Sequence, residues 1–340
     1  QELAEIRTEL ALSRGAFASR DQLVEVALLH LQPLAAFSPS LSDELLGIAR
    51  AAGITPAQAI ILNHYTDLRD VPPAVLGAHE GDPGGCTAIF VNGPDGPVLG
   101  QTWDMHGTAA PHVRLLRIRP PGADTEVLCF TLAGCVGMTG MNQAGLAITI
   151  NNLTSTDGQV GVVWPALVRR MLEETTAVAA RDVLMGATLS SGHHYMIADR
   201  DDFYGVETSG KLKMITQTGP RAVHMHTNHC FDPVLRTREK ISPKSTTFRR
   251  FELASTLCAQ QHPRSAAEVW EFLGSHEGYP KSICSHVDDE GGDPSASRTC
   301  GAMLMVCNTG QVYACNGCVH RPPPDPVCVT PVFAGSGAAG

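Results

Sequence analysis

The sequence predicts an α+β fold in which two β-sheets are stacked and helices cover them. Three observations indicate it: helical patterns fill residues 1–70, hairpins and paired strands fill most of the remainder, and a long helical segment at 164–186 interrupts the strands. A chain of 340 residues with 43% hydrophobic content can bury a sizeable core. The apolar faces of the first helices would lie in water unless they packed on the sheets, so we expect one domain.

The N-terminal helices are predicted from apolar spacing and from residues that start helices. Apolar residues recur at helical spacing in 1–13 and 22–31, a polar triplet precedes a helix beginning at Leu45, and Thr55 with Pro56 is typical of a helix start. The composition then changes to proline, glycine and aspartate up to residue 85, which is typical of a surface loop. This change marks a boundary between a helical segment and the rest of the chain.

The boundary leads into a predicted β-hairpin that begins with a cysteine. Residues 87–91 are β-branched and apolar, 92–97 are turn residues, and 98–103 are again extended. Cys86 directly follows two glycines, so the Gly85–Cys86 peptide lacks a shielding side chain on its N-terminal side and a nearby nucleophile could reach the Gly85 carbonyl. The alternative is that Cys86 is a small buried hydrophobic residue at a strand start.

The remaining elements are predicted from local patterns along the chain. Strand patterns occur at 113–118, 126–132, 146–153, 192–199, 203–207, 282–286, 298–306 and 311–315. Further helices are predicted at 245–254 and 266–273. Within 164–186, the sequence Glu-Thr-Thr at 174–176 indicates a break between two helical pieces.

The hairpin resembles the acyl-coenzyme A:6-aminopenicillanic acid acyltransferase family of N-terminal-nucleophile hydrolases. The matching sequences are Gly-Cys-Thr at 85–87 and Gly-Gln-Thr-Trp-Asp at 100–104. The resemblance implies a four-layer αββα sandwich and a precursor that cuts itself between Gly85 and Cys86, giving an α chain, 1–85, and a β chain, 86–340. The new N-terminal cysteine would supply a thiol nucleophile and an amine base, because an α-amino group has a pKa of roughly 7.7 to 8.0.

The resemblance also implies three catalytic residues beside the cysteine. Asp104, 18 positions beyond Cys86 on the hairpin, would hold and orient the new ammonium group. Asn152 matches the position whose backbone N–H stabilises the oxyanion, with Asn151 as the second choice, and Asn228 matches the position whose side-chain amide does so. The alternatives are a surface charge at the end of a strand for the aspartate and ordinary turn residues for the asparagine pair.

The implied chemistry uses one thiol twice. It attacks the Gly85 carbonyl in an N-to-S acyl shift, water releases residues 1–85, and it then attacks an amide or thioester carbonyl of the substrate. The first hypothesis is hydrolysis of small N-acyl or β-alanyl amides, including penicillin-type amides. The second is acyl transfer from a coenzyme A thioester, and the third is a self-cleaving protein without small-molecule turnover. No metal and no cofactor are assigned to this chemistry.

A hypothesis of another class is a Cys/His metal-binding protein. His224 and His226 would share one face of a strand, and Cys315 and Cys318 have a spacing that can chelate zinc. The alternative for the cysteines is buried thiols, because a strong zinc pattern would show two such pairs and the sequence shows one.

Composition limits the partners and the compartment. A net charge of −9 without any Lys/Arg run argues against nucleic acid and against a membrane surface, and no stretch of about 18 apolar residues predicts a membrane span. Eleven cysteines without framework spacing favour reduced thiols in the cytoplasm. We therefore expect a cytoplasmic enzyme that binds a small-molecule amide or a coenzyme A thioester. The sequence does not begin with methionine, so an upstream leader stays open.

Overall fold

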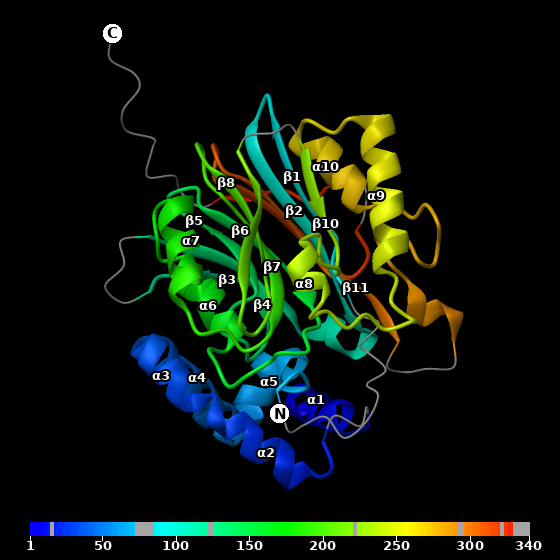
Figure 1. Cartoon of the computed structure of the whole chain (residues 1–340). Helices are drawn as coiled ribbons and strands as arrows, with labels where there is room; N and C mark the ends of the chain where they lie inside the picture. The colour runs from blue at the N-terminus through cyan, green and yellow to red at the C-terminus, as the bar shows by residue number, and fades with distance from the viewer. Residues whose placement is uncertain are drawn as a thin grey trace.

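Two antiparallel β-sheets lie face to face at the centre of the fold (Figure 1). The computed structural model describes residues 1–13, 17–71, 85–120, 125–219, 223–291, 296–319 and 323–328. The first sheet has the strand order β10 (Val223–His226), β1 (Ala88–Gly93), β2 (Gly96–His106), β11 (Ser297–Val306), β12 (Gln311–Asn316) and β13 (Val327–Cys328). The second has the order β3 (Val113–Ile118), β4 (Val127–Leu132), β5 (Thr139–Asn142), β6 (Ala147–Leu153), β7 (Gly192–Ala198), β8 (Phe203–Thr208) and β9 (Lys213–Thr218).

Helices cover the outer face of each sheet, which gives four layers (Figure 1). On the second sheet, α6 (Trp164–Met171) and α7 (Ala177–Gly186) pack their apolar faces on outward side chains of β4, β6, β7 and β8. On the first sheet, α9 (Thr247–Gln261) and α10 (Ala266–Leu273) do the same over β1, β2 and β11. The predicted α+β class and αββα layering are therefore confirmed, as is the break between α6 and α7.

The space between the sheets is filled by side chains that alternate along the strands. On β1, Ala88 and Phe90 point to the interior between the sheets, whereas Ile89 and Val91 point to α9 and α10. Phe90 meets Phe203 of the opposite sheet with ring centroids 4.1 Å apart. Because a one-residue slip would turn every inward side chain outward, this packing fixes the register of β1.

The N-terminal helices lie together at one end of the sandwich (Figure 1). They are α1 (Glu2–Ser13), α2 (Arg20–Leu29), α3 (Leu31–Phe37), α4 (Pro39–Ala52) and α5 (Pro56–Leu68). Helix α5 is buried along most of its length, and Asn63 joins it to the loop after β4 by donating to the Gly134 carbonyl (3.0 Å) and accepting from the Val136 N–H (2.9 Å). The helices and the inner faces of the sheets share one apolar core.

Among the described residues, no single helix is long and apolar enough to cross a membrane. Helices α4 and α5 satisfy the length and composition criterion for a span only as a pair, and the chain bends by 116° between them.

Some elements differ from the sequence prediction for local reasons. Helix α4 begins at Pro39 and not at Leu45, because the Ser38 hydroxyl accepts the Leu41 N–H (3.4 Å) and caps the helix earlier. The predicted strand at 282–286 forms only an isolated bridge between His286 and Arg298. The short elements α8 (Pro233–Arg236), η1 (Gly107–His112) and η2 (Val287–Glu290), and strands β5 and β9, were also not predicted.

Candidate active site

Cys86 lies two residues before the first residue of β1 and is buried, with 5% of its surface exposed. The register of the β1–β2 hairpin continues beyond the strand, so that Gly85 lies opposite Asp104. The Gly85 N–H donates to the Asp104 carbonyl (3.0 Å), and the Asp104 N–H donates to the Gly85 carbonyl (2.6 Å). The peptide bond between Gly85 and Cys86 is therefore held against β2, beside the side chain of Asp104.

The Asp104 carboxylate lies in the same buried space and is only partly satisfied. Its Oδ1 accepts a hydrogen bond from the Thr299 hydroxyl (2.7 Å), while Oδ2 has no hydrogen-bond partner among the described residues. Burial raises the pKa of this carboxyl to about 6, against the opposing effect of the Arg250 charge. One carboxylate oxygen is thus able to accept a further donor beside the cysteine.

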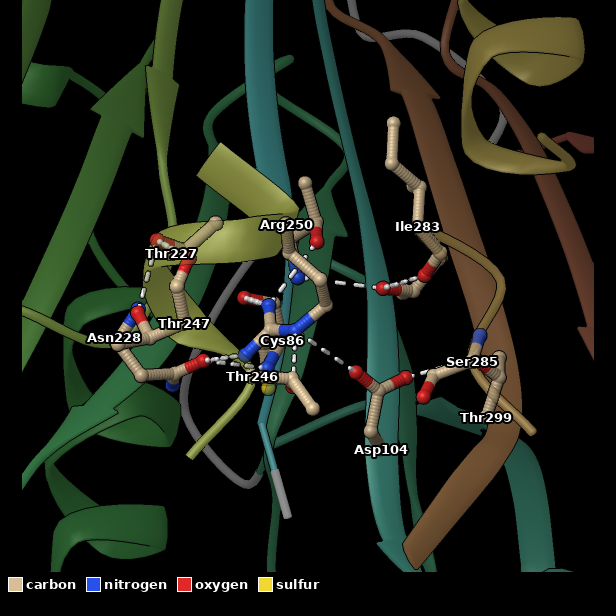
Figure 2. A network of polar contacts seen from close by, with 12 residues as sticks. Cys86, Asp104, Thr227, Asn228, Thr246, Thr247, Arg250, Ile283, Ser285 and Thr299 are labelled. Atoms are coloured by element: carbon tan, nitrogen blue, oxygen red, sulfur yellow. Dashed lines mark hydrogen bonds and ion pairs between the residues drawn. The ribbon is translucent and has the colours of Figure 1, made fainter. Parts of the chain in front are cut away.

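Arg250, on the inner face of α9, joins these groups (Figure 2). Its Nη1 donates to the Cys86 carbonyl (2.7 Å) and its Nη2 to Asn228 Oδ1 (2.7 Å). Its Nε lies 4.0 Å from Asp104 Oδ2 and donates to the Thr246 hydroxyl (2.9 Å). The buried guanidinium therefore contacts both sides of the site and partly balances the carboxylate charge.

The sequence prediction missed Arg250, although the helix pattern carries a signal for it. Positions 250, 253 and 257 recur at helical spacing, and the side chains of Arg250, Leu253 and Leu257 are all buried. An arginine on the apolar face of a helix must have buried partners, because burying an unpaired charge is costly. Its neighbour Arg249 is half exposed and pairs with Glu252 on the solvent side.

Asn228 bridges the cysteine and the second sheet. Its Oδ1 accepts the Cys86 N–H (2.9 Å) and its Nδ2 donates to the Asn152 carbonyl (3.0 Å). The backbone N–H and the arginine can only donate and the carbonyl can only accept, so the orientation of this amide is determined by its partners. The oxygen end of the side chain faces Cys86, and the nitrogen end faces β6.

The two asparagines that end β6 have different positions. Asn151 is buried and its Nδ2 donates to the Cys86 carbonyl (3.0 Å), while its Oδ1 contacts His194 Nδ1 (3.2 Å). Asn152 is half-buried and lines a pocket beside Cys86. Neighbouring strand residues point to opposite faces, which is why one asparagine binds the main chain of Cys86 and the other borders the pocket.

The pocket beside Cys86 combines apolar walls with one cation. Trp103 and Trp164 are among its apolar lining residues. Its lining also includes the Asp104 carboxylate and one cation, Arg69, which follows α5. His193 also lines it, with its Nε2 3.4 Å from Asp67 Oδ1, and burial lowers the pKa of this histidine to about 3. Arg69 and His193 were not predicted from the sequence as site residues, because nothing in their neighbourhood matches a motif.

The raised pKa of the Cys86 thiol keeps it protonated near neutral pH. Burial, together with the nearby Asp104 charge, raises the pKa of Cys86 to about 12, and Arg250 only partly opposes this. A thiol becomes a strong nucleophile as the thiolate, so this cysteine requires a proton acceptor.

The alternative hypothesis of a metal-binding protein grouped four side chains that lie apart in the structure. His226 is buried with its Nε2 2.8 Å from Glu207 Oε1, and His224 is stacked on Phe203. Both histidines are on β10, whereas Cys315 is on β12 and Cys318 follows it. Strands β1, β2 and β11 separate β10 from β12, a distance of about 19 Å at roughly 4.8 Å between neighbouring strands. These four side chains cannot bind one ion.

An αββα sandwich with a cysteine at the start of an inner strand, beside a buried carboxylate and a buried arginine, defines an enzyme of the N-terminal-nucleophile hydrolase and acyltransferase type. Residues 91–314 match the acyl-coenzyme A:6-aminopenicillanic acid acyl-transferase family. The chain belongs to this family.

Similar proteins include both acyltransferases and hydrolases. The 40 kDa form of acyl-coenzyme A:6-aminopenicillanic-acid-acyltransferase from Emericella nidulans is 27% identical over 252 residues, which cover 72% of this chain and 67% of that protein. A Caenorhabditis elegans ortholog of N-acylethanolamine-hydrolyzing acid amidase is similar in structure, with 13% identity and a TM-score of 0.44 over 65% of this chain and 93% of that one. A mutant conjugated bile acid hydrolase from Clostridium perfringens has 10% identity and a TM-score of 0.46 over 68% and 89%.

Proposed function

We propose that this chain is a precursor that cuts itself between Gly85 and Cys86 and then hydrolyses small amides through an acyl-enzyme on Cys86. The supporting observation is that both polar groups of this peptide bond have partners: the Asp104 N–H donates to the Gly85 carbonyl, and Asn228 Oδ1 accepts the Cys86 N–H. Arg250 holds the carbonyl of the next peptide, that of Cys86. A peptide bond held by partners on its carbonyl and its nitrogen is positioned for attack by the thiol that follows it.

In the first stage the thiol attacks the preceding carbonyl carbon. The Cys86 sulfur forms a bond to the Gly85 carbon, the C–N bond breaks, and the proton of the thiol goes to the leaving nitrogen. The Asp104 N–H, 2.6 Å from the Gly85 oxygen, is placed to stabilise the negative charge that develops there. Water then hydrolyses the thioester, which leaves a carboxylate on Gly85 and an amine on Cys86.

In the second stage the new amine is the base for its own thiol. It forms where the Cys86 nitrogen lies, 2.9 Å from Asn228 Oδ1, and the open oxygen of Asp104 supports its positive charge. The thiolate attacks the substrate carbonyl. The Asn152 backbone and the second N–H of the Asn228 amide stabilise the oxyanion, since an amide has two such donors and Asn152 occupies one. The amide C–N bond then breaks, and the leaving amine takes the proton held by the Cys86 amine. Water hydrolyses the acyl-enzyme and restores the thiol.

The pocket suggests the class of substrate. Its tryptophans, Trp103 and Trp164, suit a flat apolar group, and Arg69 suits a carboxylate on the same molecule. An N-acyl amino acid or a penicillin-type amide has both features. Acyl transfer from a coenzyme A thioester to an amine is the second candidate, because the relative from Emericella nidulans is named as an acyltransferase.

Intact mass under denaturing conditions tests the first stage. We expect two fragments that meet at the Gly85–Cys86 bond, a single uncut chain for Cys86→Ala, and normal cleavage for the buried-thiol control Cys129→Ala, which lies on the outer face of the second sheet. An uncut but active wild-type chain would refute the proposal.

Product analysis separates the two activities. The cleaved protein is incubated with penicillin-type and N-acyl amino acid amides in buffer, and then with an acyl-coenzyme A and 6-aminopenicillanic acid. Free amine from the first mixture supports hydrolysis. A new amide from the second, without hydrolysis in the first, would replace our first choice with acyl transfer.

A further inference from the structure

Four side chains of types that commonly bind metals lie together where the segment after α10 meets the residues after β12. They are His276, Cys284 and His286, from the segment after α10, and Cys318, which follows β12. One nitrogen or sulfur atom of each lies within 4.8 Å of the corresponding atoms of the other three. Cys284 and His286 are buried, Cys318 is half-buried and His276 is exposed, so the cluster reaches the surface at His276.

The distances around the cluster are those of a tetrahedral site. Tetrahedral zinc with Zn–S of about 2.3 Å and Zn–N of about 2.0–2.1 Å separates two sulfurs by ~3.8 Å, two nitrogens by ~3.3 Å, and a sulfur from a nitrogen by ~3.6 Å. Here Cys284 Sγ and Cys318 Sγ are 3.6 Å apart, and His276 Nε2 and His286 Nε2 are 3.1 Å apart. The sulfur–nitrogen distances are 3.8 Å (Cys284 to His286) and 3.2 Å (Cys318 to His276).

The surroundings of the cluster also fit bound thiolate and imidazole. The Val319 N–H donates to Cys284 Sγ (3.4 Å), a contact that stabilises negative charge on sulfur. His286 turns Nε2 to the cluster and has its other ring nitrogen, Nδ1, 3.8 Å from the carboxylate of Asp289. A carboxylate beside the second nitrogen is a common arrangement for a histidine that binds a metal through the first.

We propose that His276, Cys284, His286 and Cys318 bind one zinc ion. Binding would release one proton from each thiol, so that two thiolates and two neutral imidazoles balance the charge of Zn²⁺. Four protein ligands fill the tetrahedral coordination shell and leave no open position, which assigns the ion a structural role and not a catalytic one.

The cluster is connected to the active site through Ser285, which lies between two of the proposed ligands. The segment 282–286 has no regular strand pairing, yet its Ser285 N–H donates to the Thr299 hydroxyl (2.8 Å), which donates to Asp104 Oδ1 (2.7 Å) (Figure 2). An ion bound to Cys284 and His286 would fix the residues on both sides of Ser285. We therefore infer that the zinc site holds the hydrogen-bond chain that positions the Asp104 carboxylate.

Metal analysis of the full chain tests the proposal. The protein is purified without chelators, and its zinc is measured by plasma mass spectrometry against protein concentration. We expect one zinc per chain in the wild type, less than a tenth of that in Cys318→Ser, and full occupancy in Cys315→Ser, a matched control three positions away on β12 that is outside the cluster. Cobalt exchanged into the site should give the absorption bands of a tetrahedral ion with thiolate ligands.

A second measurement on the wild type does not depend on variants that fold. Without chelator, the half-buried Cys318 should resist alkylation, and it should react once a strong zinc chelator is added, while Cys315 labels equally in the two conditions. A wild type without stoichiometric metal, equal labelling with and without chelator, or a disulfide between Cys284 and Cys318 would each overturn the proposal. None of these outcomes depends on whether Gly85 and Cys86 are cleaved.

Discussion

Replacing Asp104 with asparagine is expected to remove a pH-dependent loss of stability in the uncut chain. Burial raises the pKa of Asp104 to about 6 in the folded protein, whereas an unfolded chain has an aspartate pKa of about 3.9. A folded pKa above the unfolded one means that the protonated carboxyl favours folding. This contribution is fully present below about pH 4 and is lost as the pH rises through about 6.

The size of the effect follows from the difference between the two pKa values. Two pKa units correspond to about 3 kcal/mol of unfolding free energy. Asparagine keeps the acceptor for the Thr299 hydroxyl and has a similar volume, so the substitution removes the ionisation and little else. The asparagine variant should therefore gain about 3 kcal/mol relative to the aspartate protein between about pH 4 and pH 7.

Urea unfolding across this pH range measures the effect. Both proteins carry Cys86→Ala, which is expected to keep the chain uncut as in the structure. Subtracting one curve from the other cancels groups common to both, including Asp70, whose pKa burial also raises to about 6. A difference that does not change with pH, or that grows in favour of the aspartate protein as the pH rises, would refute the reasoning.

Three further substitutions test other parts of the site. Arg250→Met should abolish self-cleavage. It should also lower the free energy of unfolding, measured in urea, by about 3–5 kcal/mol, because it leaves the buried Asp104 carboxylate unpaired. The half-exposed control Arg249→Met should change stability little. Gly85→Ala should leave a single chain by intact mass, because its Cβ would clash with Nη2 of the buried Arg250. Gly186→Ala, whose Cβ meets nothing within 4 Å, should be cut normally. Arg69→Met should raise KM for amides that carry a carboxylate and leave neutral amides unaffected, and an equal effect on both would exclude its proposed role.

The sequence predicts the hairpin and hence the neighbourhood of Cys86, because both depend on local patterns. An apolar strand, a turn rich in proline and glycine, and a second strand determine which residues face each other, and this places Gly85 opposite Asp104. The layering is also predictable, since apolar stripes on helices and alternation on strands show which faces must be buried. The family resemblance adds Asn228 and Asn152 but does not show which atom of the amide faces the cysteine.

Contacts between distant segments are not predictable in this way. Arg250 is 164 positions from Cys86 and lies in a helix whose polar residues are mostly exposed, so local patterns do not indicate its partners. The two-residue spacing of Cys315 and Cys318 is misleading for the same reason. Cys315 pairs with Ala302 inside the first sheet, whereas Cys318 turns to the segment after α10, 34 positions earlier at Cys284. Which ligands meet is decided by tertiary packing and not by spacing along the chain.

The buried carboxylate connects the two stages of the proposed reaction. In the uncut chain Asp104 faces one cation, Arg250, at 4.0 Å, and burial still raises its pKa to about 6. Cleavage would add a second cation, the Cys86 ammonium, and an opposite charge favours the ionised carboxylate. The free-energy cost of the buried, ionised Asp104 carboxylate would therefore fall when the bond breaks. This favours cleavage at neutral pH over cleavage in acid. The pH-dependent step in stability assigned to Asp104 should accordingly move to lower pH in the cleaved protein. A step at an unchanged pH would show that the carboxylate does not interact with the new amine.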